Sequence, residues 1–146
     1  MSNDHNASSS PRAMRPEDCS RILVAALESG DLEASVAVYE ADAILFKKSG
    51  EPMTGLDAIR TSNAGLIAMK PTFTIDFIHA TISADGTLAT NRMKADLSWT
   101  DKEGKMKQGS VDTLEVLRRQ PDGSWRYVID DPYGSMRAGM AQRQPA

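Results

Sequence analysis

The sequence predicts an α+β fold in which helices near the front of the chain pack on a mostly antiparallel sheet. Apolar residues recur at helical spacing in three segments before Pro71, whereas after Pro71 they alternate with a period of two. Turn signals at 85–86, 101–104 and 121–123 divide the second part into long strands. At 146 residues the chain is the size of one domain with a real core.

Two helices joined by a short corner open the predicted domain. Pro16 and two acids after it are typical of a first helical turn, and an apolar stripe follows over 19–27. Gly30 is suited to end this helix, and the Asp31 side chain can cap a second helix over 31–40. These residues therefore predict a tight pair of helices.

A short strand and a third helix come next. The apolar run 43–46 predicts a strand, 47–55 a loop, and the pattern over 56–70 a helix that Pro71 ends. Four strands are then expected over 73–83, 88–100, 106–119 and 124–133. The alternation is cleanest over 88–100, where one face carries Ala89, Asn91, Met93, Ala95, Leu97 and Trp99.

Composition excludes several classes of function. A net charge of −3 without a cluster of Lys and Arg argues against a nucleic-acid surface, and no apolar run is long enough to span a membrane. A single cysteine and two histidines supply neither an internal disulfide nor a Cys/His zinc cluster. We expect a cytoplasmic protein without metal or cofactor, with disordered segments at 1–16 and 135–146 flanking a domain at 17–134.

Three separated stretches resemble the NTF2-like superfamily, in particular its SnoaL-like and ketosteroid-isomerase-like members. They are ALESGDLEASVAVYEADAIL, EPMTGLDAIR and LRRQPDGSWRYVIDDP, in that order. The resemblance implies a cone: a strongly curved sheet wraps around helices and leaves an apolar pocket at its open end. It also implies a homodimer formed through the sheets. The superfamily includes isomerases, dehydratases, hydrolases and non-catalytic modules, so the resemblance fixes the fold and not the reaction.

Only one of the three catalytic positions of ketosteroid isomerases finds a match. The place of their carboxylate base is taken here by Lys47 or Lys48, and the place of their tyrosine falls near Leu23. Asp112, on the penultimate strand, lies where their second acid lies. The resemblance therefore implies a pocket acid at Asp112 but not the known steroid isomerase chemistry.

Asp112 has two interpretations. It shares a strand face with Leu114 and Val116, and a carboxyl among apolar residues needs a partner or a raised pKa. As a pocket acid it would donate a proton or a hydrogen bond to a ligand oxygen. Alternatively it faces solvent and pairs with an Arg or Lys of a neighbouring strand.

Asp130 and Asp131 end the last strand, and only one of them can face the pocket because neighbouring residues point to opposite faces. We expect Asp131 there, on the same face as Tyr127, which is then a candidate ligand contact as well; the alternative is a strand-end turn set by Pro132. Asp112 and Asp131 would then form a pair of catalytic acids with separated pKa values.

Four further residues are candidate ligand contacts. Asn91 interrupts an apolar strand face and can orient a ligand, although it can equally satisfy a buried backbone group. His79 is a natural proton carrier but has no partner fixed by spacing. Met93 suits an apolar pocket or ordinary core, and Trp99 suits a ligand contact, the sheet face or a dimer interface.

Two hypotheses of function follow. In the first, the protein binds a mainly apolar small molecule in its pocket and performs cofactor-free acid–base catalysis of isomerase, dehydratase or hydrolase type. In the second, it is a non-catalytic dimeric association module whose sheet surface does the work. The two differ in whether acids lie inside the pocket.

Overall fold

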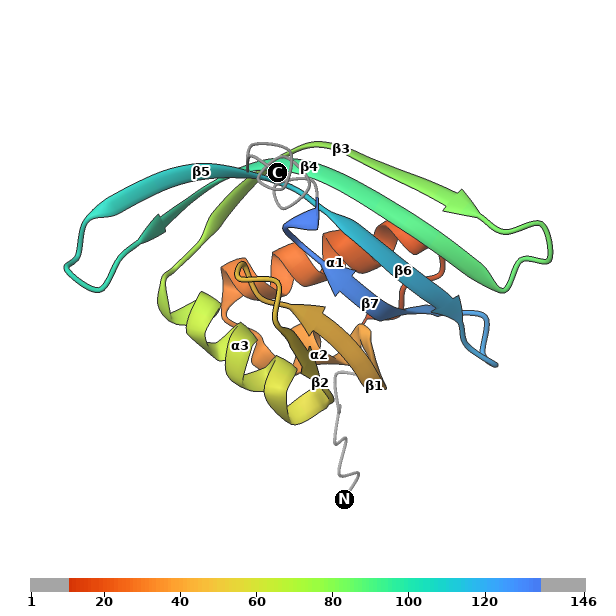
Figure 1. The fold of residues 1–146 in the computed structure, drawn as a ribbon. Helices are drawn as coiled ribbons and strands as arrows, with labels where there is room; N and C mark the ends of the chain where they lie inside the picture. The colour runs from red at the N-terminus through yellow and green to blue at the C-terminus, as the bar shows by residue number, and fades with distance from the viewer. Residues whose placement is uncertain (1–10, 135–146) are drawn as a thin grey trace, which may run out of the picture.

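A computed structural model describes residues 11–134 and confirms the α+β class (Figure 1). The helices of this part are α1 (Pro16–Ser29), α2 (Leu32–Ala37) and α3 (Leu56–Ala68). Its strands are β1 (Tyr39–Phe46), β2 (Pro52–Thr54), β3 (Thr72–Ile82), β4 (Leu88–Thr100), β5 (Met106–Asp112), β6 (Leu114–Arg119) and β7 (Trp125–Asp131).

One curved sheet covers the helices, as the cone architecture requires (Figure 1). Its strand order is β2-β1-β7-β6-β4-β3, and β5 pairs with β4 off this path. The β1–β7 pair is parallel and the other pairs are antiparallel. Figure 1 shows β3 and β4 arching above α1, and α3 lies below α1 in the same view.

Strand β4 is long enough to pair with two successive strands, which corrects the single strand predicted over 106–119. Its first part pairs with β6 and its second part with β5. Thr113 lies between these two strands, where its backbone N–H donates to the Met93 carbonyl at 2.9 Å. The Thr113 Oγ1 accepts from the Met93 N–H at 3.1 Å. Both strands pair with β4 in one continuous antiparallel register, and the ladder is interrupted only at Thr113, where the side-chain oxygen takes the Met93 N–H.

The helical corner forms as predicted. Gly30 follows α1 with φ 78°, a left-handed conformation that glycine adopts without steric cost. The Asp31 side chain accepts a hydrogen bond from the Ala34 N–H at 3.1 Å and so caps α2. Helix α2 is shorter than predicted, because Tyr39 already belongs to β1 and the Val38 carbonyl accepts from the Tyr127 N–H at 2.7 Å.

Residues 11–16 are ordered although their composition predicts disorder. Ala13 is buried, and its carbonyl accepts a hydrogen bond from the Trp125 N–H at 2.8 Å. This backbone contact fixes the segment against the start of β7. The remaining residues for which disorder is predicted, 1–10 and 135–146, lie outside the described part of the chain.

The core has two parts, and they leave room for a cavity between them. The larger part joins Cys19 of α1 and Ile59 of α3 to buried residues of β1 and β7. The smaller part joins Val24 to Met93 and Ala95 of β4. In residues 11–134, no helix is long and apolar enough to cross a membrane.

Candidate functional site

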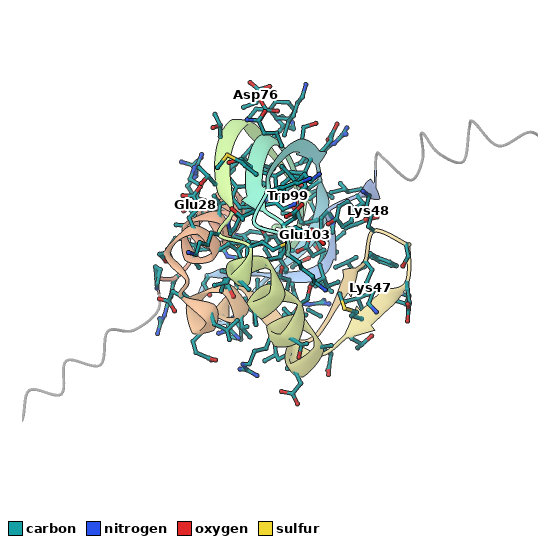
Figure 2. The ribbon with its side chains drawn as sticks, turned by 90° about the vertical axis from the view of Figure 1, so that its left-hand side faces the viewer. Glu28, Lys47, Lys48, Asp76, Trp99 and Glu103 are labelled. Carbon is teal, nitrogen blue, oxygen red and sulfur yellow. The ribbon has the colours of Figure 1, made fainter. Side chains whose placement is uncertain are left out.

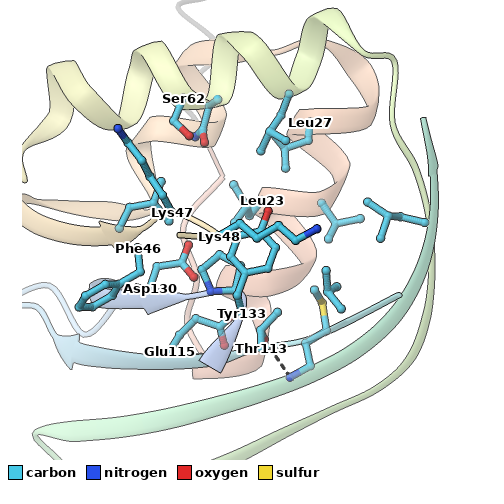
Figure 3. A pocket seen from close by; sticks show the side chains of 18 of the residues that line it. Leu23, Leu27, Phe46, Lys47, Lys48, Ser62, Thr113, Glu115, Asp130 and Tyr133 are labelled. Carbon is cyan, nitrogen blue, oxygen red and sulfur yellow. Dashed lines mark hydrogen bonds between the residues drawn. The ribbon is translucent and has the colours of Figure 1, made fainter. Parts of the chain in front are cut away.

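A cavity of about 290 Å³ lies between the helices and the concave face of the sheet (Figure 3). Most of its wall is apolar, and the contributing side chains include Leu23, Val24, Leu27, Leu66, Phe73 and Met93. Figure 3 shows Leu23 and Leu27 of α1 and Ser62 of α3 on one side, and the ends of β6 and β7 on the other. The cavity is near the lower end of the size range of small-molecule sites.

Two carboxyl groups, Glu115 of β6 and Asp130 of β7, line the sheet side of this cavity. They are direct cross-strand partners, and each is only 3% exposed. Side chains in such a pair stand next to each other on one face of the sheet. The arrangement is therefore a buried carboxyl pair in an apolar cavity.

The pair is electrostatically strained in its ionised form. Burial raises the pKa of Asp130 to about 6, against the opposing effect of a hydrogen bond from Tyr39. Burial, and then the charge of Asp130, raise the pKa of Glu115 well above its ordinary value, while a hydrogen bond with the Thr113 side chain lowers it. The Tyr39 hydroxyl donates to Asp130 Oδ2 at 2.6 Å, a short bond typical of an ionised acceptor. One carboxyl is thus favoured as an acid and the other as a base.

Two lysines supply positive charge at the rim. Lys47 and Lys48 follow β1 and line the cavity, and Figure 2 shows them on the same side of the molecule. Lys47 Nζ lies 3.6 Å from a carboxylate oxygen of Glu51, whereas Figure 3 shows the Lys48 side chain reaching over the cavity beside Tyr133. Lys48 could therefore form an ion pair with an anionic group of a ligand in the cavity.

The acid of the last strand that enters the cavity is Asp130, so the placement of Asp131 there was wrong. The register of β7 shifts against both neighbours, between Tyr127 and Ile129. This bulge puts an additional residue into β7, so Tyr127 and Asp130 are both buried on the inner side. Asp131 is half-buried, and its Oδ1 accepts from the Tyr133 N–H at 3.2 Å, as in a strand-end turn.

Asp112 does not line the cavity either, so its expected placement in the pocket was wrong. It ends β5, and its carboxylate accepts a hydrogen bond from the Arg92 guanidinium of β4 at 3.0 Å. The two side chains are 38% and 50% exposed. The solvent-facing alternative, a pairing with an Arg of a neighbouring strand, is the one that the structure contains.

We expect Asp112→Asn to change the free energy of unfolding by no more than about 1 kcal/mol, because exposed ion pairs contribute little. Chemical denaturation at neutral pH measures this value. The same variant should bind any cavity ligand with unchanged affinity. A loss of ligand affinity would mean that Asp112 acts on the cavity from outside.

Asn91 and Tyr127 lie behind the cavity wall and are not part of its lining. Both are fully buried. The Asn91 amide nitrogen donates to the Pro16 carbonyl at 2.7 Å and to Ser20 Oγ at 3.2 Å. Ser20 Oγ in turn lies 3.0 Å from the Tyr127 hydroxyl. Together these groups form a buried polar cluster between α1 and the sheet.

The other candidate contacts are divided between the cavity and the outside. Met93 is buried and lines the cavity. Trp99 is outside its lining and packs on Gly109 of β5, where an added Cβ would lie 3.2 Å from the indole ring. His79 is exposed on β3 and is also absent from the lining. Of the sequence-derived contacts, Met93 alone is part of the lining.

Glu115 and Tyr39 were missed from sequence. Glu115 had a usable signal, because it lies at alternate spacing with Val111, Thr113 and Leu117 and so interrupts an apolar strand face with a charge. Tyr39 had none, since the helical pattern continued over it. In the described part of the chain, no group of three or more His, Cys, Asp or Glu side chains is arranged to hold a metal ion.

Comparisons with known proteins agree with this architecture. Residues 21–128 match the model of the SnoaL-like domain. An NTF2-like superfamily protein from Salmonella enterica is 12% identical, with a TM-score of 0.69 and coverage of 79% of this chain and 84% of that one. A ketosteroid isomerase-like protein from Erwinia carotovora is 19% identical, with a TM-score of 0.66 and coverage of 78% and 88%.

A third solved structure, Aln2 from a Streptomyces species, is 17% identical with a TM-score of 0.66 and covers 83% of this chain and 91% of its own. At such identities the likeness concerns the fold alone. None of the curated proteins compared with the sequence matches it significantly.

Proposed function

The chain belongs to the family of SnoaL-like domains, and from that premise we propose that its cavity binds a small, mainly apolar molecule and transfers a proton on it. The single observation that carries the proposal is the pair Glu115 and Asp130, two buried carboxyls in direct register that face an apolar cavity. Carboxyls are seldom buried without a function or a cationic partner.

The lining supports a ligand with an apolar body and at least one oxygen. Side chains of α1, α3 and β4 would surround the apolar part, and a ligand oxygen could accept a hydrogen bond from the protonated carboxyl. Lys48 at the rim favours a ligand that also carries a negative group. The volume of about 290 Å³ suits a molecule of one or two small rings.

The chemistry follows from the two carboxyls. An ionised carboxylate can take a proton from a carbon next to a carbonyl, and a neutral carboxyl can give one to an oxygen. Dehydration needs these two events. In isomerisation the base returns the proton to another carbon of the substrate, and in addition of water the base takes the proton from the water instead, so the two carboxyls can supply the proton transfers of all three. Cofactor-free acid–base catalysis is therefore the reaction class that we propose.

A second candidate is a dimeric association module. Large apolar side chains are exposed on the sheet, with Phe77 at 44%, Leu114 at 43% and Met106 at 72%. Such a surface favours contact with another chain, and a homodimer is the partner we propose for it. The module needs no cavity ligand, which separates it from the first candidate.

Blocking the cavity tests the first candidate. In Ser62→Phe a large ring replaces a small lining side chain of α3 and should occupy part of the cavity. Native mass spectrometry of the purified wild type should show a retained molecule, or binding from a panel of small apolar acids and ketones. The Ser62→Phe variant should lose at least about 90% of that binding, since overpacking leaves no room.

Thr61→Phe is the matched control, because the neighbouring Thr61 is exposed and outside the cavity lining. It should bind like the wild type. A wild type that stays empty against the whole panel, yet is dimeric, would refute the ligand-binding proposal and favour the association module. The same spectra give the subunit number and so test the homodimer.

A further inference from the structure

The amide of Asn91 is held in one orientation by the polar cluster behind the cavity. Its nitrogen lies 2.7 Å from the Pro16 carbonyl oxygen. A carbonyl oxygen can only accept, so the amide nitrogen and not the amide oxygen must face Pro16. Asn91 Oδ1 is left on the other side of the amide, buried and without a hydrogen-bond partner among residues 11–134.

In the same described part of the chain, a second buried oxygen without a hydrogen-bond partner belongs to Glu115, at Oε2. Asn91 of β4 and Glu115 of β6 are direct cross-strand partners, and both side chains are buried on the inner side. Directly opposed side chains have Cβ atoms about 4.5–5.5 Å apart. The two oxygens thus belong to neighbouring side chains, and each requires a donor.

A proton on Glu115 would give both of these buried oxygens a hydrogen-bond partner. The protonated carboxyl becomes a donor, and Asn91 Oδ1 is an acceptor that nothing else uses. Asp130 differs, because its Oδ2 already accepts from the Tyr39 hydroxyl at 2.6 Å. Glu115 also has a hydrogen bond with the Thr113 side chain. Its Oε2, however, belongs to the side chain next to the unused acceptor Asn91 Oδ1, whereas Asp130 Oδ2 accepts from a donor.

We propose that in the empty cavity Glu115 carries the proton of the carboxyl pair and donates it to Asn91 Oδ1, which makes Asn91 a positioning residue. Asn91 fixes Glu115 as the acid, and Asp130 is left as the ionised base. This division of roles rests on the proposed proton transfer in the same cavity. It gives a function to an amide that does not touch the cavity itself.

The surrounding groups are compatible with this division. The titratable side chains that act on or face Glu115 are Asp130 and Tyr127 of β7, Tyr39 of β1 and Cys19 of α1, with Lys47 and Lys48 on the rim of the same cavity. Asp130, when ionised, disfavours a second negative charge on Glu115. The pKa of Glu115 is accordingly well above its ordinary value, and that of Asp130 is about 6.

Infrared difference spectroscopy tests the proposal on the unliganded full chain. The spectrum of the wild type minus that of Glu115→Gln, taken at pH 8, should contain the C=O band of a protonated carboxylic acid. Glu115→Gln keeps a donor toward Asn91 Oδ1, so the variant should fold. In Asn91→Leu the band should move to higher frequency, because its O–H loses the acceptor.

Ser20→Ala is the control, since it removes one partner of the Asn91 nitrogen and leaves Oδ1 in place. Its band should stay at the wild-type frequency. If Asn91→Leu does not fold, the pH dependence of the wild-type band still tests the proposal. The C=O band of the protonated acid must persist at pH values above the pKa of Asp130.

Absence of the band at pH 8 would overturn the proposal, because Glu115 would then be ionised and another donor, such as a buried water, would have to satisfy Asn91. So would a band that stays unshifted in folded Asn91→Leu. Either result leaves ligand binding in the Ser62→Phe experiment untouched. An empty wild-type cavity in that experiment would refute the proposed function and leave the infrared result as it is.

Discussion

Replacing Asp130 by Asn is expected to stabilise the folded protein by about 3 kcal/mol above pH 6 and to abolish proton abstraction in the cavity. The pKa of Asp130 is raised by burial from 3.8 to about 6 in the folded state. The folded chain therefore binds this proton more tightly than the unfolded chain does. Its contribution to stability is fully present below about pH 4 and is lost as the pH rises through about 6.

The measurement is chemical denaturation of the wild type and of Asp130→Asn at intervals from pH 4 to pH 8. The variant's advantage should be small at pH 4, grow up to about pH 6 and then level off. Asp112→Asn, which removes a partly exposed carboxylate, serves as the control for a general effect of lost negative charge. An Asp130→Asn variant less stable than the wild type at pH 8 would contradict the strained-carboxyl description.

Replacing Tyr39 by Phe should raise the pKa of Asp130 above about 6, by about 1–2 units. The Tyr39 hydroxyl is a donor to the ionised carboxylate, at 2.6 Å, and its hydrogen bond lowers the pKa. A hydrogen bond to a charged group is worth about 1.5–3 kcal/mol, and each pKa unit corresponds to about 1.4 kcal/mol. The phenyl ring retains the packing on Tyr127, whose ring centroid lies 5.1 Å away.

Carboxyl ¹³C NMR titration measures this shift, with the Asp130→Asn spectrum used to assign the resonance. Tyr133→Phe is the matched control, a tyrosine that lines the same cavity from beyond the end of β7. It should move the Asp130 midpoint less than Tyr39→Phe does. Equal midpoints in the wild type and Tyr39→Phe would show that the hydroxyl does not tune the base. The pH dependence of any reaction in this cavity should follow the same shift.

The helical corner and the alternation of buried and exposed residues in β4 were predictable from sequence because both depend on local signals. A glycine commonly ends a helix, and an aspartate commonly caps the next one. Gly30 and Asp31 lie between two stretches of helical apolar spacing and have these two roles here. The alternation over 88–100 also holds in β4, where Ala89, Met93 and Ala95 are buried. The break between β5 and β6 was not predictable, because it depends on the contact of Thr113 with Met93 of β4, a residue far away in the chain.

In the candidate site, too, local patterns were predictable from sequence and long-range contacts were not. The expectation of an acid in an apolar pocket came from the resemblance, which selected Asp112, and the counting of alternate residues selected Asp131. In β7 the count fails at the bulge, which brings Asp130 inside. Within β6 the count holds, and it would have selected Glu115 had the face of Val111 and Thr113 been followed further.

By itself, the sequence determined the α+β class, the order of the three helices and the long strands, and the presence of carboxyls on the last two strands, since spacing and turn chemistry act between near neighbours. It missed β2, which lies in the predicted loop 47–55. The tertiary structure alone decided which carboxyls meet. Glu115 of β6 lies opposite Asp130 of β7 on one side and opposite Asn91 of β4 on the other, because of the register in which these strands pair. Burial then raises the pKa values of the two acids, and burial is a property of the packed sheet and helices together.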